Sequence, residues 1–119
     1  MRYFVTGGAG FIGSNYVRHL LATDPEAQVT NFDKLTYAGN RASVADLEDD
    51  PRYRFVQGDI CDPGQVAEVM AGQDVVVNFA AETHVDRSIV EPLAAVRTNT
   101  LGVATLAEGA RRAGVGRFL

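Results

Sequence analysis

The 119-residue sequence has a single cysteine, Cys61, so it has no partner for an internal disulfide. It lacks an apolar run long enough for a membrane-spanning helix. Basic residues are in the minority, with 11 Lys and Arg against 15 Asp and Glu, and the net charge of −4 argues against nucleic acid as the main partner. No secretory leader is visible either, because the N-terminus opens directly on a predicted strand. We therefore expect a cytoplasmic protein that binds neither membranes nor nucleic acid.

Strand-like and helix-like segments alternate along the chain, with no repeat or low-complexity block between them. Strands are predicted where short apolar runs occur, at residues 2–5, 28–32, 54–57 and 74–81. Helices are predicted where helical spacing or capping residues occur, at residues 11–21, 42–50, 63–70 and 93–113. This alternation predicts an α/β fold with a Rossmann-type doubly wound parallel sheet, in which residues 1–119 form the N-terminal part of a nucleotide-binding domain.

The last residues of the chain bear on the edge of this sheet. Residues 116–119 resemble the entry to a fifth strand that is not completed, which would leave the apolar run at 74–81 as an unpaired edge. An unpaired apolar edge invites aggregation or pairing with another chain. We therefore expect a sheet truncated after about four strands, within the N-terminal part of a larger enzyme whose substrate domain is absent here.

The most informative motif is the glycine-rich segment at residues 5–13, where Gly7, Gly10 and Gly13 follow a predicted strand and open a predicted helix. Glycine lets the backbone turn sharply and approach a pyrophosphate, while the N–H groups of the new helix face the phosphates. Asp33 follows Gly13 by 20 residues, as expected for a carboxylate that accepts hydrogen bonds from the adenosine ribose. The alternative is a strand-end turn or a helix cap. Because the Asp33 charge would repel a 2′-phosphate, the motif predicts NAD rather than NADP as the cofactor.

Three segments carry a resemblance to a known family: residues 6–15, 33–40 and 80–88. On these segments the chain resembles the extended short-chain dehydrogenase/reductase family and, within it, the nucleotide-sugar 4,6-dehydratases that act on dTDP-glucose. The resemblance covers the whole chain. It implies a lyase that converts dTDP-glucose to dTDP-4-keto-6-deoxyglucose through transient hydride transfer to NAD. It also implies a homodimer for the full-length enzyme, with residues 93–113 in one of the paired helices.

The residues that carry out this chemistry in the family have no counterpart in the chain. The sequence contains no Tyr-x-x-x-Lys motif and no Ser/Thr-Thr-Asp-Glu run. The first of these motifs supplies the base that deprotonates the sugar hydroxyl in the family, and the second supplies the acid and base for elimination. No catalytic residue is therefore assigned, and we expect the chain alone not to turn over.

The resemblance implies a set of cofactor-binding residues, most of them at the carboxyl ends of the predicted strands. They are Gly7, Gly10, Phe11, Ile12, Gly13, Asp33, Lys34, Leu35, Thr36, Asp59, Ile60, Phe79, Ala80, Ala81, Thr83 and Thr98. Phe11 and Ile12 would lie along the pyrophosphate, and Asp59 and Ile60 would hold the adenine edge and pack on its ring. From the residues alone, Phe11 and Ile12 could instead be core residues, residues 34–39 could be a surface loop, and Asp59 could cap a turn.

The resemblance assigns Thr83 and His84 to the substrate. The family usually has serine at the position of Thr83, and threonine keeps the hydroxyl. His84 could equally be a solvated loop histidine. Asn99 resembles a family asparagine that supports a proton-relay water chain, although it could also be an exposed helix residue. No metal ligands are assigned.

Two other functions stay open. Another NAD-dependent nucleotide-sugar enzyme, an epimerase or a decarboxylase, would share the same cofactor motif. A non-catalytic NAD-binding fragment would instead require a stable fold and measurable affinity for NAD without any further residues.

Overall fold

The computed structural model describes residues 1–35, 41–80, 93 and 96–119, without the side chains of residues 43, 97 and 98. Five parallel strands form one sheet in the order β3-β2-β1-β4-β5. They are β1 (Arg2–Thr6), β2 (Gln28–Asp33), β3 (Tyr53–Gln57), β4 (Val75–Asn78) and β5 (Arg117–Phe118). Val5 on the central strand pairs with Asn31 of β2 and with Val77 of β4. The predicted α/β, Rossmann-type parallel sheet is confirmed.

β5 corrects the prediction that the fourth strand is an unpaired edge. Val75 and Val76 of β4 pair with Arg117 and Phe118 of β5. Leu119 N–H also donates to Val76 O at 2.8 Å, and Asn78 N–H donates to Leu119 O at 2.9 Å. These bonds pair backbone groups on the outer side of β4. The described sheet therefore has five strands rather than four, and β4 lies inside it.

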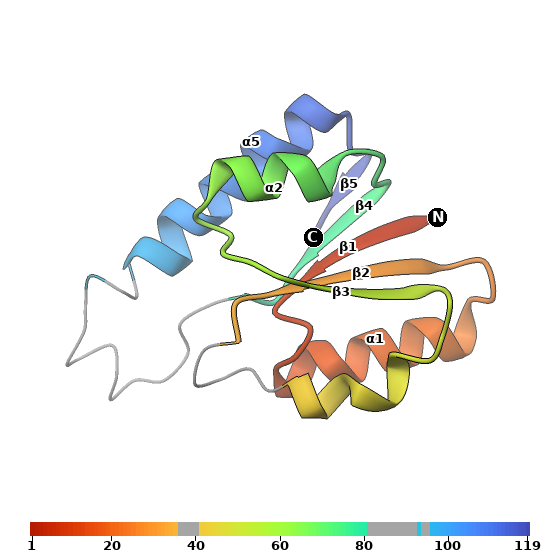
Figure 1. The fold of residues 1–119 in the computed structure, drawn as a ribbon. Helices are drawn as coiled ribbons and strands as arrows, with labels where there is room; N and C mark the ends of the chain where they lie inside the picture. The colour runs from red at the N-terminus through yellow and green to blue at the C-terminus, as the bar shows by residue number, and fades with distance from the viewer. Residues whose placement is uncertain (36–40, 81–92, 94–95) are drawn as a thin grey trace.

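Helices cover both faces of the sheet (Figure 1). α1 (Phe11–Thr23) and the 3₁₀ segment η1 (Arg41–Leu47) lie on one face, and α2 (Pro63–Met70) and α5 (Val103–Ala113) lie on the other. α5 continues a π-helical stretch, η2 (Arg97–Gly102), where the apolar spacing predicts an uninterrupted α-helix. No helix within the described ranges is long and apolar enough to span a bilayer.

Two helix-boundary residues behave as their types predict. The Asp62 carboxylate caps α2 by accepting from Gly64 N–H at 3.0 Å and Gln65 N–H at 3.2 Å, with Pro63 at the first helical position. Gly114 ends α5 in the left-handed conformation, at φ 73°. These two residues fix the start of α2 and the end of α5.

The sheet is apolar on both faces because helices cover both. The core on the α1 face consists of aliphatic side chains that include Val5, Val17, Leu20, Val29 and Val77. The core beneath α2 and α5 includes Phe4, Phe32, Val66, Met70, Val76 and Leu106. The Phe4 and Phe32 ring centroids lie 5.3 Å apart in this second layer. These two layers hold the strands in place and bring their carboxyl ends together at one edge.

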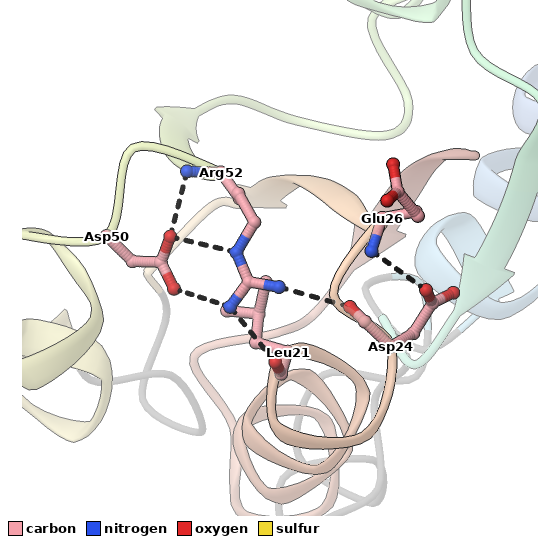
Figure 2. Close-up of polar contacts among 5 residues, drawn as sticks. All are labelled: Leu21, Asp24, Glu26, Asp50 and Arg52. Atoms are coloured by element: carbon pink, nitrogen blue, oxygen red, sulfur yellow. Dashed lines mark hydrogen bonds and ion pairs between the residues drawn. The ribbon is translucent and has the colours of Figure 1, made fainter.

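Arg52 ties the C-terminal end of α1 to the start of β3 (Figure 2). Its guanidinium donates to Leu21 O at 3.0 Å and to Asp24 O at 3.1 Å, two carbonyls at the helix end. The same group forms a two-point ion pair with the Asp50 carboxylate, at 2.9 and 3.2 Å. The hydrogen bond from Arg52 holds the pKa of Asp50 below its usual value. This contact lies at the amino ends of the strands, opposite the edge described next.

Candidate functional site

The strand order reverses between β1 and β4, because β2 and β3 extend to one side of β1 while β4 and β5 extend to the other. In open parallel sheets of this kind, ligands bind in the crevice beyond the carboxyl ends of the strands at such a reversal. Thr6 ends β1 and Asn78 ends β4, and the Thr6 hydroxyl donates to Asn78 Oδ1 at 2.5 Å. Asn78 Oδ1 also accepts from Ala80 N–H at 3.1 Å. The two strand ends are therefore held side by side.

The glycine loop after β1 approaches its neighbours more closely than a side chain would allow. Gly7 has φ 68°, and a Cβ there would lie 2.6 Å from Ala80 N and 2.7 Å from Phe79 C. A Cβ on Gly13 in the first turn of α1 would lie 2.3 Å from Gly7 O. Glycine is thus required at both positions, one against the exit of β4 and one where the helix meets the loop.

The N-terminus of α1 has no side chain that caps it. Gly10 occupies the capping position, and the first turn contains no acidic residue. Phe11 and Ile12 are 84% and 67% exposed, so the alternative that they are core residues is wrong. Backbone N–H groups at an uncapped helix start, together with the positive end of the helix dipole, suit an anion such as a pyrophosphate.

Asp33 links the glycine loop to the end of β2. Its Oδ2 accepts from Ala9 N–H at 2.9 Å and its Oδ1 accepts from Leu35 N–H at 2.7 Å. Leu35 has φ 60°, a left-handed conformation that is uncommon for leucine and that tends to occur at ligand sites. The Asp33 carboxylate is buried and has no basic partner among the residues that the structure describes. Each of its oxygens keeps a lone pair for a hydroxyl donor.

Asp59 and Lys34 lie beside each other where β3 and β2 end. Lys34 Nζ is 3.4 Å from Asp59 Oδ2, and Asp59 Oδ1 accepts from Cys61 N–H at 2.8 Å. Burial would raise the pKa of Asp59, but the Cys61 hydrogen bond and the Lys34 charge outweigh it and lower that pKa. The Ile60 side chain is buried in the core, where a Cβ on Gly102 would lie 2.4 Å from Ile60 Cδ1. Asp59 thus forms a turn through Oδ1 alone, as the turn-forming alternative predicts. This turn leaves Oδ2 outside the contact with Cys61, so it is compatible with a ligand role for Asp59.

Comparison with known proteins assigns the chain to a family. The family model described as GDP-mannose 4,6 dehydratase matches residues 4–119. The chain belongs to the GDP-mannose 4,6 dehydratase family. It is 54% identical over 123 residues to a dTDP-glucose 4,6-dehydratase from Streptomyces niveus, a match that covers 100% of this chain and 37% of that protein.

Solved structures extend this family likeness to the fold. A dTDP-glucose 4,6-dehydratase from Streptomyces venezuelae, with NAD and TYD bound, matches with a TM-score of 0.95 and 53% identity over 99% of this chain and 38% of its own. The UDP-glucose 4-epimerase from Thermus thermophilus, in complex with NAD, matches with a TM-score of 0.85 and 33% identity. This match covers 99% of this chain and 36% of the epimerase chain. The chain thus spans little more than a third of these relatives.

Within this family framework, the structure gathers most of the predicted cofactor residues at one edge of the sheet. Gly7, Phe11, Asp33, Asp59 and Ala80 all lie at or just beyond the carboxyl ends of strands. Phe79 directs its ring toward Tyr16 of α1, at 5.3 Å between centroids. A cavity of about 300 Å³ opens elsewhere, beside Arg2 and Arg54 at the amino ends of the strands.

Several predicted residues lie outside the described part of the chain. They are Thr36, Ala81, Thr83 and His84. Thr98 lies in η2, but its side chain is not described. The substrate contacts of Thr83 and His84 and the cofactor contacts of all these residues stay predictions. Within the described ranges, no group of three His, Cys, Asp or Glu side chains could hold a metal ion.

Sequence reasoning missed Asn31, a polar residue beneath the glycine loop. It is fully buried on β2, and its Nδ2 donates to the Tyr53 hydroxyl at 3.0 Å. A signal was present, because an asparagine stands between Thr30 and Phe32 in a predicted apolar strand. Asn78 lies within the predicted strand at residues 74–81, where the strand pattern gave no sign that its side chain joins the ends of β1 and β4.

Proposed function

We propose that the chain is the NAD-binding part of a dehydratase that converts dTDP-glucose to dTDP-4-keto-6-deoxyglucose. The observation that carries the proposal is the buried Asp33 carboxylate, 2.9 Å from Ala9 N in the glycine loop and next to an uncapped helix start. A dinucleotide needs these two features together, because it presents ribose hydroxyls and a pyrophosphate a few ångströms apart.

The residues present suit NAD, because the uncapped start of α1 and the Asp33 carboxylate lie on either side of the glycine loop. Gly7 lets the loop pack against the exit of β4, and Gly13 lets α1 pack against the loop, so the uncapped start of α1 lies at the edge where a pyrophosphate would bind. When bound, NAD supplies the hydride acceptor for oxidation of the sugar. The first turn of α1 would hold the pyrophosphate, Asp33 would accept from the ribose hydroxyls, and Asp59 would accept from the adenine amine. The Asp33 charge disfavours the 2′-phosphate of NADP.

Greater identity with the dTDP-glucose 4,6-dehydratases than with the epimerases favours the dehydratase reaction. Thr83 and His84 would contact the sugar nucleotide. The base, the acid and the tyrosine-lysine pair must come from residues outside this chain, because it lacks the motifs that supply them. The parent enzyme would be a cytoplasmic homodimer, and the chain alone would bind NAD without turnover.

Cofactor binding is tested by calorimetric titration of the 119-residue chain with NAD and with NADP. We expect NAD to bind more tightly than NADP. Asp33→Asn should weaken NAD binding by about 10–100-fold, because hydrogen bonds to a carboxylate are worth roughly 1.5–3 kcal/mol. The same variant should narrow the preference for NAD over NADP. Equal binding of the two cofactors by the unmodified chain would contradict the assignment of Asp33.

The reaction is tested with a chimera in which this chain replaces the corresponding third of the Streptomyces niveus dehydratase. We expect the chimera to form a 4-keto-6-deoxy sugar from dTDP-glucose, which is detected by mass spectrometry. The matched control carries Asp33→Asn and should lose most of that activity. A chimera that binds NAD but gives no such product would argue against the dehydratase assignment.

A further inference from the structure

Asn31 is the one fully buried amide in the described part of the α1-side core, and local folding does not explain it. Its Nδ2 donates to the Tyr53 hydroxyl at 3.0 Å, whereas its Oδ1 has no hydrogen-bond partner among the described residues. A buried acceptor without a partner destabilises a fold, and an apolar side chain of the same shape would avoid that loss. A residue that breaks a folding rule in this way points to a functional demand.

The Asn31 amide lies directly beneath Gly8 of the glycine loop. A Cβ on Gly8 would lie 2.3 Å from Asn31 Oδ1, 2.6 Å from its Cγ and 2.9 Å from its Nδ2. Asp33, two residues further along the same face of β2, accepts from Ala9 N–H at 2.9 Å. Consecutive loop residues therefore contact alternate side chains of one strand. Gly8 packs against Asn31, and Ala9 donates to Asp33.

Tyr53 on the neighbouring strand holds the amide in this orientation. Its side chain is buried, and burial raises the pKa of its hydroxyl, so the group stays neutral at physiological pH. The bond to Nδ2 directs that end of the amide toward β3. Oδ1 is then the amide atom that lies nearest to a Cβ placed on Gly8.

We propose that Asn31 is a positioning residue for the dinucleotide, which sets the height of the Gly8–Ala9 segment above β2. It acts through the loop and touches no part of the cofactor. Its effect falls on the pyrophosphate, because the segment leads directly into Gly10 and the first turn of α1. This inference rests on the proposed NAD-binding function.

The test is the double variant Asn31→Leu/Tyr53→Phe, which replaces both hydrogen-bonding groups with apolar groups of similar shape. We expect its urea unfolding midpoint to equal or exceed that of the unmodified chain. Its affinity for NAD should fall about 10-fold, whereas its affinity for adenosine, which lacks the pyrophosphate, should not change. A purely structural role for Asn31 would not separate the two ligands. Tyr53→Phe alone keeps the Asn31 amide but removes its hydrogen-bond partner, and it should lower the affinity for NAD by a smaller factor than the double variant does.

The failure of this proposal is distinct from the failure of the proposed function. If the unmodified chain does not bind NAD, the function itself is wrong. If it binds NAD and the double variant binds NAD equally well, the positioning role of Asn31 is overturned.

A second pair of variants approaches the same contact from the loop, in case the double variant does not fold. Gly8→Ala should weaken NAD binding because its Cβ overlaps the amide, and Gly8→Ala/Asn31→Ala should recover part of that affinity because the amide is removed. Gly8→Ala should reduce NAD affinity by a smaller factor in the Asn31→Ala background than in the unmodified chain. Equal factors in the two backgrounds would overturn the proposal.

Discussion

Alanine at Gly7 should disrupt the cofactor edge for two separable reasons. The first reason is the backbone conformation of Gly7, φ 68°, in which a residue with a side chain is strained. The second is that a Cβ at this position would overlap the backbone of the β4 exit, 2.6 Å from Ala80 N and 2.7 Å from Phe79 C. Gly114 provides a matched control. It has nearly the same backbone conformation, φ 73°, but a Cβ there would meet nothing within 4 Å.

The magnitude follows from comparing the two sites. A left-handed alanine is less favourable by about 1–2 kcal/mol, and reduced freedom of the unfolded chain returns roughly 0.4–1 kcal/mol. Gly114→Ala should therefore lower the free energy of unfolding by about 1 kcal/mol. Gly7→Ala shares this backbone effect and adds an overlap with backbone atoms that cannot rotate away, which is worth roughly 1–3 kcal/mol. We expect a total loss of about 2–4 kcal/mol for Gly7→Ala.

Urea unfolding followed by circular dichroism measures both losses, and NAD titration of each folded variant measures the effect on the site. Gly7→Ala should also weaken NAD binding, because the loop must move away from Phe79 and Ala80, whereas Gly114→Ala should leave NAD affinity unchanged. Equal losses of stability in the two variants would refute the close approach of the loop to the β4 exit.

Two further predictions concern contacts away from the cofactor edge. Arg52→Lys should lower the thermal unfolding midpoint by about 5 °C without changing NAD affinity. Lysine cannot reproduce the planar guanidinium that donates to Asp50 and to the end of α1. An unchanged midpoint would contradict the stabilising role of these contacts. Hydrogen bonds from Arg111 and Arg112 lower the pKa of Glu108 from 4.5 to about 2. The stability that Glu108 contributes is therefore complete above its pKa in the unfolded chain and is lost as the pH falls toward 2. The difference in urea midpoint between the unmodified chain and Glu108→Gln should therefore be larger at pH 7 than at pH 3, and a difference that is independent of pH would argue against these ion pairs.

Local signals in the sequence determined which segments are extended, which are helical, and where the glycine loop lies, but not the 3₁₀ and π-helical character of η1 and η2. The alternation of apolar runs and helical segments predicted the parallel sheet, and the cap at Asp62 and the stop at Gly114 lie where their side chains or conformations require. Gly7, Gly13 and Asp33 were likewise assigned from their spacing and from the predicted strands and helix around them. Such signals depend on residues a few positions apart or on a motif of known length, so they can be interpreted without a fold.

Only the tertiary structure decided the contacts that cross the sheet. The support of Gly8 by Asn31, the bond from Ala9 to Asp33 and the pairing of β4 with β5 each join segments that are distant in the chain. The sequence indicated the entry to a fifth strand at residues 116–119, but so short a run was not expected to pair, and an unpaired edge at β4 was predicted. The backbone groups of residues 117–118 pair because α5 returns the chain beside β4. The order of the strands places these side chains together, and that order is a property of the packed helices and sheet rather than of any local run of residues.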